Sequence, residues 1–130
     1  MNNIRTENKT NAKKSLEIVR GDVVRVNLGS NVGSEQNGIR PCIVLSDDLN
    51  NIYSPTINIL PLTSKVNSKR KLPHHVIIDN EYIRMASIAL CEQIDTVDKS
   101  RIVGNVLFKL SKDELREVSK AVIGQLRLLD

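Results

Sequence analysis

The 130-residue chain fits one domain, and its 40% hydrophobic residues are sufficient for one modest core. Its formal net charge of +4 favours a polyanionic partner without identifying one. Two tyrosines, one phenylalanine and no tryptophan argue against a nucleic-acid surface built on aromatic stacking.

The first half of the chain predicts a leader followed by strands. Residues 1–17 are polar and basic, and we expect them to form a flexible leader outside a single domain of residues 18–130. Alternating apolar residues predict a strand over 23–28. Glycines and small polar residues then predict a long loop over 29–38, before a second strand over 39–46.

The middle of the chain predicts more short strands. Residues 47–53 are expected to form a polar connection, and 56–62 a third strand that bends or lies at an edge because it contains Pro61. A basic loop over 65–72 follows. Further strands are expected over 73–79, 85–93 and 102–110.

The C-terminal segment predicts a helix. Ser111 and Glu114 have the spacing of a capping box. Apolar residues follow at helical spacing: Leu115, Val118, Val122, Leu126 and Leu129. About six short strands and one amphipathic helix indicate a mainly β (α+β) fold, a small barrel with the helix covering one side.

Cysteines and histidines give no support for a metal site. Cys42 and Cys91 each lie in an apolar run, which favours buried free thiols in a reducing compartment. His74 and His75 are adjacent, so on a strand they would point to opposite faces, and a surface or packing role is expected. We find no apolar run long enough for a signal peptide or a membrane span, so a cytoplasmic protein without metal or cofactor is predicted.

The most informative stretch is the loop that leads into the second strand. It carries Ser34, Glu35, Gln36 and Asn37 and then places Arg40 at the strand's start. A planar guanidinium matches phosphate oxygens, although Arg40 pairing with an acid is the simpler alternative. The hydroxyls of Thr63 and Ser64 follow the third strand. The basic run after them has no acid and is either a solvated loop or a binding site: Lys65, Lys69, Arg70 and Lys71.

An ordered set of motifs over residues 19–130 resembles the MazF/PemK toxins. The matching blocks, in the family's order and spacing, are Arg20-Gly-Asp22, Val32-Gly-Ser-Glu-Gln36, Gly38-Ile-Arg-Pro41, Tyr53-Ser-Pro-Thr56, Leu62-Thr-Ser64, Lys71-Leu-Pro73 with His75-Val76, Glu92-Gln-Ile94 and Thr96-Val-Asp-Lys99. The resemblance implies an SH3-like barrel with a C-terminal helix and a homodimer. It also implies a sequence-specific, metal-independent ribonuclease for single-stranded RNA, inhibited by an antitoxin whose acidic, partly disordered tail occupies the RNA groove.

The resemblance also implies residue roles. Arg40 and Thr63 match the family's catalytic positions, and Ser34 and Gln36 match positions that line the RNA groove. Glu92 matches an acidic position to which the plasmid-borne branch assigns a catalytic part. That branch has an arginine where Leu90 stands in this sequence, so its catalytic mechanism applies poorly to this chain.

The expected chemistry is attack by the RNA's own 2′-hydroxyl, giving a 2′,3′-cyclic phosphate and a 5′-hydroxyl end. Arg40 would clamp the phosphate and Thr63 would donate to one of its oxygens. Glu35, Glu92 or water could be the base, with Ser64 as a further auxiliary group. Asn37 and the basic run would contact RNA together with Ser34 and Gln36. Two alternatives are a non-catalytic toxin of the related CcdB type, which binds a protein target, and an inactive relative that binds RNA or antitoxin.

Overall fold

The computed structural model describes residues 17–33, 35–64 and 72–129. The elements in chain order are β1 (Asp22–Asn27), β2 (Ile39–Val44), α1 (Asp48–Tyr53), β3 (Thr56–Thr63), β4 (Val76–Ile78), β5 (Ser87–Ala89), the 3-10 helix η1 (Cys91–Gln93), β6 (Asp95–Asp98), the 3-10 helix η2 (Lys99–Arg101), β7 (Ile102–Lys109) and α2 (Lys112–Leu126). Apart from Glu17, the expected leader lies outside the described residues.

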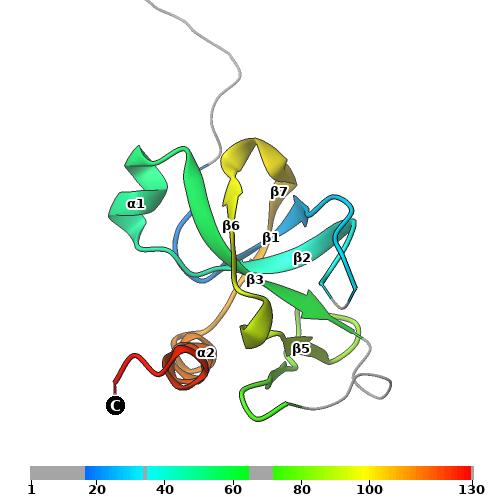
Figure 1. Ribbon diagram of the computed structural model, residues 1–130, viewed down its shortest axis with the longest axis vertical. Helices are drawn as coiled ribbons and strands as arrows, with labels where there is room; N and C mark the ends of the chain where they lie inside the picture. The colour runs from blue at the N-terminus through cyan, green and yellow to red at the C-terminus, as the bar shows by residue number, and fades with distance from the viewer. Residues whose placement is uncertain (1–16, 34, 65–71, 130) are drawn as a thin grey trace, which may run out of the picture.

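The strands pair antiparallel in one bent sheet. Its order is β4-β5-β3-β2-β1-β7, and β6 pairs with β3 beside this path. In Figure 1 the strands cross one another at steep angles, with α1 beside the start of β3 and α2 below the sheet. The expected mainly β fold with a C-terminal helix is confirmed. Among the described strands the path ends at β4 and β7, so the barrel is open.

Several local predictions are wrong, among them the expected strand over 85–93, of which Ser87–Ala89 form β5 and Cys91–Gln93 form η1. The expected polar connection is α1, which Asp47 caps by accepting a hydrogen bond from the Leu49 N–H at 3.0 Å. Its one buried side chain is Asn51, so no apolar stripe marks it in the sequence. The strand β6 was also missed, because only Val97 of its four residues is buried.

Pro61 lies where β3 changes neighbour. On one side β3 pairs with β2 over Ile59–Pro61, and on the other it pairs first with β6 and then with β5. The Pro61 carbonyl accepts from the Leu90 N–H at 3.0 Å, so the missing proline N–H faces the junction between β6 and β5. The proline therefore stands within the sheet rather than at its edge, without breaking a ladder.

Each face of the sheet covers its own cluster of buried side chains. The alternation along β1 sends Val24 and Val26 to one cluster and Val23 to the other. The first cluster also holds Cys42 of β2. The second contains Val118, the buried residue of α2, so the helix covers this second face.

The C-terminal helix begins where the sequence predicts. The Ser111 hydroxyl accepts from the Glu114 N–H at 3.1 Å, and a Glu114 carboxylate oxygen accepts from the Ser111 N–H at 2.9 Å. The helix ends at Leu126, and Arg127 adopts the left-handed conformation with φ 53°. Leu129, expected on the helix, lies beyond it and is exposed. In the part of the chain that the structure describes, no helix has the length and apolar character required to cross a membrane.

Candidate functional site

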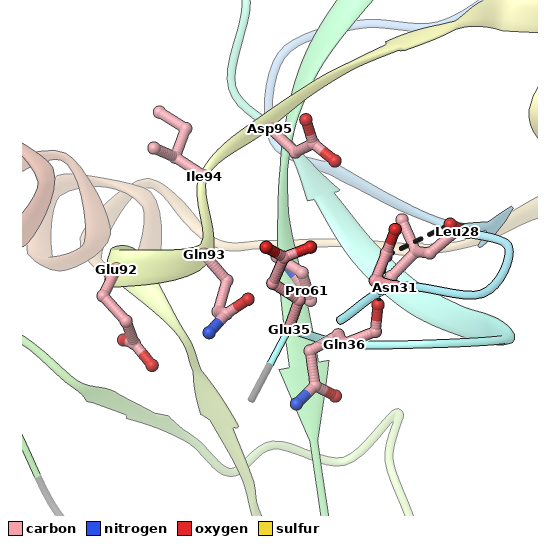
Figure 2. Close-up of a pocket in the computed structure, with 9 residues that line it drawn as sticks. All are labelled: Leu28, Asn31, Glu35, Gln36, Pro61, Glu92, Gln93, Ile94 and Asp95. Atoms are coloured by element: carbon pink, nitrogen blue, oxygen red, sulfur yellow. Dashed lines mark hydrogen bonds between the residues drawn. The ribbon is translucent and has the colours of Figure 1, made fainter. Parts of the chain in front are cut away.

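A polar groove of about 290 Å³ lies on the sheet face of the first cluster. Nine residues line it: Leu28, Asn31, Glu35, Gln36, Pro61, Glu92, Gln93, Ile94 and Asp95. Figure 2 shows the side chains of Gln36 and Gln93 on either side of Pro61, one from each wall of the groove. Carboxylates and primary amides dominate the lining, so the groove fits a ligand rich in hydrogen-bonding groups.

One wall is the loop between β1 and β2. Its base is closed by two backbone bonds, from the Leu28 N–H to the Gly38 carbonyl at 2.8 Å and from the Gly38 N–H to the Gly29 carbonyl at 2.9 Å. The amide of Asn31 crosses the loop and donates to the Leu28 and Gln36 carbonyls at 3.2 and 2.6 Å. Gly29 and Gly38 have φ of 74°, a backbone conformation that glycine adopts without strain. The glycine-rich sequence thus folds into a loop that presents Glu35 and Gln36 to the groove.

The opposite wall is η1 and the residues after it. Leu90 and Cys91 are fully buried beneath this wall, while Glu92 and Gln93 face the groove. A carboxylate oxygen of Glu92 lies 2.8 Å from Nε2 of His75, whose side chain is 1% exposed. Nδ1 of the same ring accepts from the Leu72 N–H at 3.3 Å. The sequence segment just before β4 therefore holds Glu92 in place.

Arg40 and Thr63 lie on the groove's face of the sheet. β2 and β3 pair with Cys42 opposite Pro61, where their register ends, and Arg40 and Thr63 lie two residues beyond that pair on their strands. Neither residue is part of the groove lining. Side chains two apart on a strand share a face, so both residues point to the side of Cys42 and Pro61. Arg40 is partly exposed and its Nε donates to the Asn37 carbonyl at 2.8 Å, whereas Thr63 is 5% exposed.

The other predicted site residues divide into two groups. Glu35, Gln36 and Glu92 line the groove, Asn37 holds Arg40 through its carbonyl, and Ser64 is exposed just after β3. The rest lie outside the described residues: Ser34, Lys65, Lys69, Arg70 and Lys71. The described lining of the groove carries three carboxylates and no cation. The cations expected to attract RNA are therefore Arg40 and the basic run, not residues of the described groove lining.

Sequence reasoning missed four residues of this site. Asn31, Gln93 and Asp95 line the groove, and His75 fixes Glu92. Gln93 stands in the Glu92-Gln-Ile94 motif, but no pattern in the sequence indicates that its side chain faces the groove. The histidine was expected to have a surface or packing role, and its hydrogen bond to a residue 17 positions away has no local signal.

The two histidines have different neighbours, as alternating positions predict. His75 bonds Glu92, whereas the His74 ring lies against Gly124 of α2, within 2.6 Å of the place a Cβ would occupy there. In the described ranges no group of three or more His, Cys, Asp or Glu side chains is arranged to hold a metal ion. Both cysteines are free and buried, as predicted. Burial, with Asp95 nearby, raises the pKa of Cys42 to about 12.

Comparison with known proteins identifies the family. The sequence model of the PemK-like, MazF-like toxins of type II toxin–antitoxin systems matches residues 19–126. The chain belongs to this family. It is 39% identical over 105 residues to the endoribonuclease MazF of Staphylococcus saprophyticus, a match that covers 79% of this chain and 86% of that protein.

Solved structures of toxins share this fold. MazF from Deinococcus radiodurans superposes with a TM-score of 0.72 at 25% identity, covering 85% of this chain and 96% of that one. The MazE–MazF complex from the same organism gives a TM-score of 0.65 at 21% identity, covering 84% and 94%. A mycobacterial endoribonuclease in complex with its cognate antitoxin gives 0.67 at 19% identity, covering 88% and 97%. The last two likenesses concern the fold alone.

Proposed function

We propose that this toxin-family chain is an endoribonuclease that cuts single-stranded RNA at a short sequence without a metal ion, leaving 2′,3′-cyclic phosphate and 5′-hydroxyl ends. Family membership and the 39% identity to a protein named endoribonuclease MazF support the activity. The observation that carries the site assignment is the register of β2 and β3. Alternation from the Cys42–Pro61 pair supports a guanidinium and a hydroxyl on the face that carries Pro61, a residue of the groove lining.

The metal-free route follows from what these two groups supply. Attack by the 2′-hydroxyl on the adjacent phosphorus builds negative charge on the non-bridging oxygens and on the departing 5′-oxygen. The Arg40 guanidinium binds that phosphate and stabilises the departing oxygen, and the Thr63 hydroxyl donates to a non-bridging oxygen. The Asn37 carbonyl, 2.8 Å from Nε, fixes the direction of the Arg40 side chain before RNA binds.

The groove lining supports the choice of RNA as substrate. Single-stranded RNA presents splayed bases whose edges donate and accept hydrogen bonds, and amides and carboxylates match such edges. Glu35 and Glu92 both line the groove, so either carboxylate or a water molecule can take the proton of the 2′-hydroxyl. Lys65, Lys69, Arg70 and Lys71 add attraction for the phosphate backbone, which makes binding sensitive to salt. Ser34, Gln36 and Asn37 complete the proposed RNA contacts, and Ser64 is a further auxiliary group.

The partners follow from the family. We propose a cytoplasmic homodimer held inactive by an antitoxin whose acidic, partly disordered tail covers the RNA-binding surface, with Arg40 and the basic run as the cations that attract it. The likeness to toxin structures solved with an antitoxin supports such a partner. A neighbouring short reading frame for an acidic protein would be the expected genetic companion.

The test is incubation of the purified protein with a long single-stranded RNA in excess EDTA. We expect discrete cuts whose downstream fragments carry 5′-hydroxyl ends, detected because polynucleotide kinase labels them without prior phosphatase treatment. RNA that stays intact in EDTA but is cut when Mg²⁺ is added would contradict the metal-free route. RNA that stays intact under both conditions would favour a non-catalytic toxin of the CcdB type or an inactive relative.

A further inference from the structure

His75 is a buried histidine whose hydrogen bonds define its tautomer. Its side chain is 1% exposed, and its Nδ1 accepts from the Leu72 N–H at 3.3 Å. A nitrogen that accepts carries no proton, so in the neutral ring the proton is on Nε2. Nε2 therefore donates to the Glu92 carboxylate at 2.8 Å. The histidine thus acts as a fixed donor between Leu72 and the groove wall.

This bond commits one of the two carboxylate oxygens of Glu92 to His75. The Glu92 side chain is 21% exposed and lines the groove. Among the described residues, Oε2 makes no hydrogen bond, while Oε1 is held by His75. A glutamate side chain on a surface samples many rotamers, and a buried donor removes much of that freedom before a ligand arrives. Glu92 is therefore presented to the groove as a preoriented acceptor.

The chemistry of the lining selects the kind of group that Glu92 accepts from. Glu35, Glu92 and Asp95 are acceptors only when ionised, and together they repel a phosphate. A base with an exocyclic amino group offers them donors: N6 of adenine, N4 of cytosine, or N1 and N2 of guanine. Uracil offers a single N–H between two carbonyl acceptors, which face carboxylates unfavourably. The groove is thus complementary to an amino-bearing base and not to the phosphodiester.

We propose that Glu92 is a specificity-determining residue that accepts a hydrogen bond from the amino group of an RNA base, and that His75 is the positioning residue that orients it. This inference rests on the proposed function, and it assigns Glu92 to base recognition in place of proton abstraction. Arg40 and Thr63 then act on the phosphate, and the wall formed by η1 recognises the base.

The test uses a random-sequence RNA library cut by the full-length protein in EDTA, with the fragment ends sequenced. The wild type is expected to require adenine, cytosine or guanine at one position near the cut. Glu92→Gln, which replaces one acceptor oxygen with a donor, is expected to reduce discrimination against uracil at that position roughly tenfold. Glu117→Gln, at an exposed glutamate on α2 outside the groove, is the matched control and should keep the wild-type profile.

Two variants of His75 separate positioning from a general structural role. His75→Gln keeps a donor near the place of Nε2, and His75→Asn keeps an acceptor near the place of Nδ1 but loses the donor to Glu92. We expect the Gln variant to retain the wild-type profile and the Asn variant to relax it in the same direction as Glu92→Gln. A role in stability alone would lower the melting temperature of both variants without separating their profiles, and that result would overturn the assignment of His75.

The outcomes distinguish this inference from the proposed function. If Glu92→Gln keeps the base profile but cuts more than a hundredfold more slowly, Glu92 is the catalytic base, and the inference is wrong while the ribonuclease function stands. The inference is equally wrong if wild-type cuts require uracil at every specified position. If the wild type fails to cut the library in EDTA, both the metal-free function and the inference fall.

Discussion

The two walls of the groove are built differently. The wall at η1 rests on the core: Leu90 and Cys91 are fully buried, the Leu90 N–H donates to the Pro61 carbonyl at 3.0 Å, and His75 fixes Glu92. The wall formed by the loop over residues 29–38 is mostly exposed, with Val32 82% exposed. In the described part of this loop, hydrogen bonds from Asn31 and Arg40 reach only residues of the segment 28–40.

The difference separates two ways of preparing a binding surface. A wall supported by buried side chains keeps its recognition groups in one orientation, which favours discrimination between bases. A loop held by short-range hydrogen bonds opens at low free-energy cost, which favours admission of RNA or an antitoxin tail. Affinity and specificity are therefore expected to depend on opposite sides of the same groove.

The largest contrast should appear in stability. Leu90→Ala removes a fully buried side chain beneath η1 and is expected to lower the free energy of unfolding by about 2–5 kcal/mol. Val32→Ala, on the loop, should change it by less than about 0.5 kcal/mol because the side chain is exposed. Urea denaturation followed by circular dichroism measures both. Equal losses in the two variants would show that the walls do not differ in their support.

A smaller effect is expected from the thiols at high pH. Burial, with carboxylates nearby, raises the pKa of Cys42 from 9.0 to about 12 and that of Cys91 to about 11. Between pH 9 and 11 the unfolded chain loses thiol protons that the folded chain keeps. The unfolded state then binds fewer protons, so the free energy of unfolding falls as pH rises, by up to about 1.4 kcal/mol per pH unit for each thiol.

Cys91 lies in η1, so the pH dependence that its thiol adds to stability tests the burial of the wall at η1. Cys91→Ala should flatten the decline between pH 9 and 11, measured as urea midpoints at half-unit steps. An identical slope in the variant and the wild type would mean that the thiol is not buried as described.

Sequence reasoning could reach what local patterns encode. The alternation in β1, the glycines of the following loop and the capping box of α2 predict their elements closely. The helix α1 could not be predicted from the sequence because its apolar residues Leu49, Ile52 and Tyr53 are exposed and form no buried stripe. The strand β6 is too short to show a period, and it exists because β3 offers it a partner.

The site was predictable only in its motif residues. Glu35, Gln36 and Glu92 were named from motifs or from their place in the loop, and all three line the groove. Asp95 and Asn31 were not, because they reach the groove through the pairing of β6 and the folding of the loop. The bond between His75 and Glu92 joins two segments that only the tertiary fold brings together. Motifs therefore locate such a site, and pairing between distant strands completes it.

The central claim is that Arg40 and Thr63 act on one phosphodiester, and a double-mutant cycle tests it most directly. Single-turnover cleavage of one RNA is measured for the wild type, Arg40→Ala, Thr63→Val and the double variant, each shown to be folded. Arg40→Ala is expected to lose about 10²–10³ in rate, with the double variant losing far less than the product of the two single losses. Strictly multiplicative losses, or a Thr63→Val variant that cuts at the wild-type rate, would contradict the account.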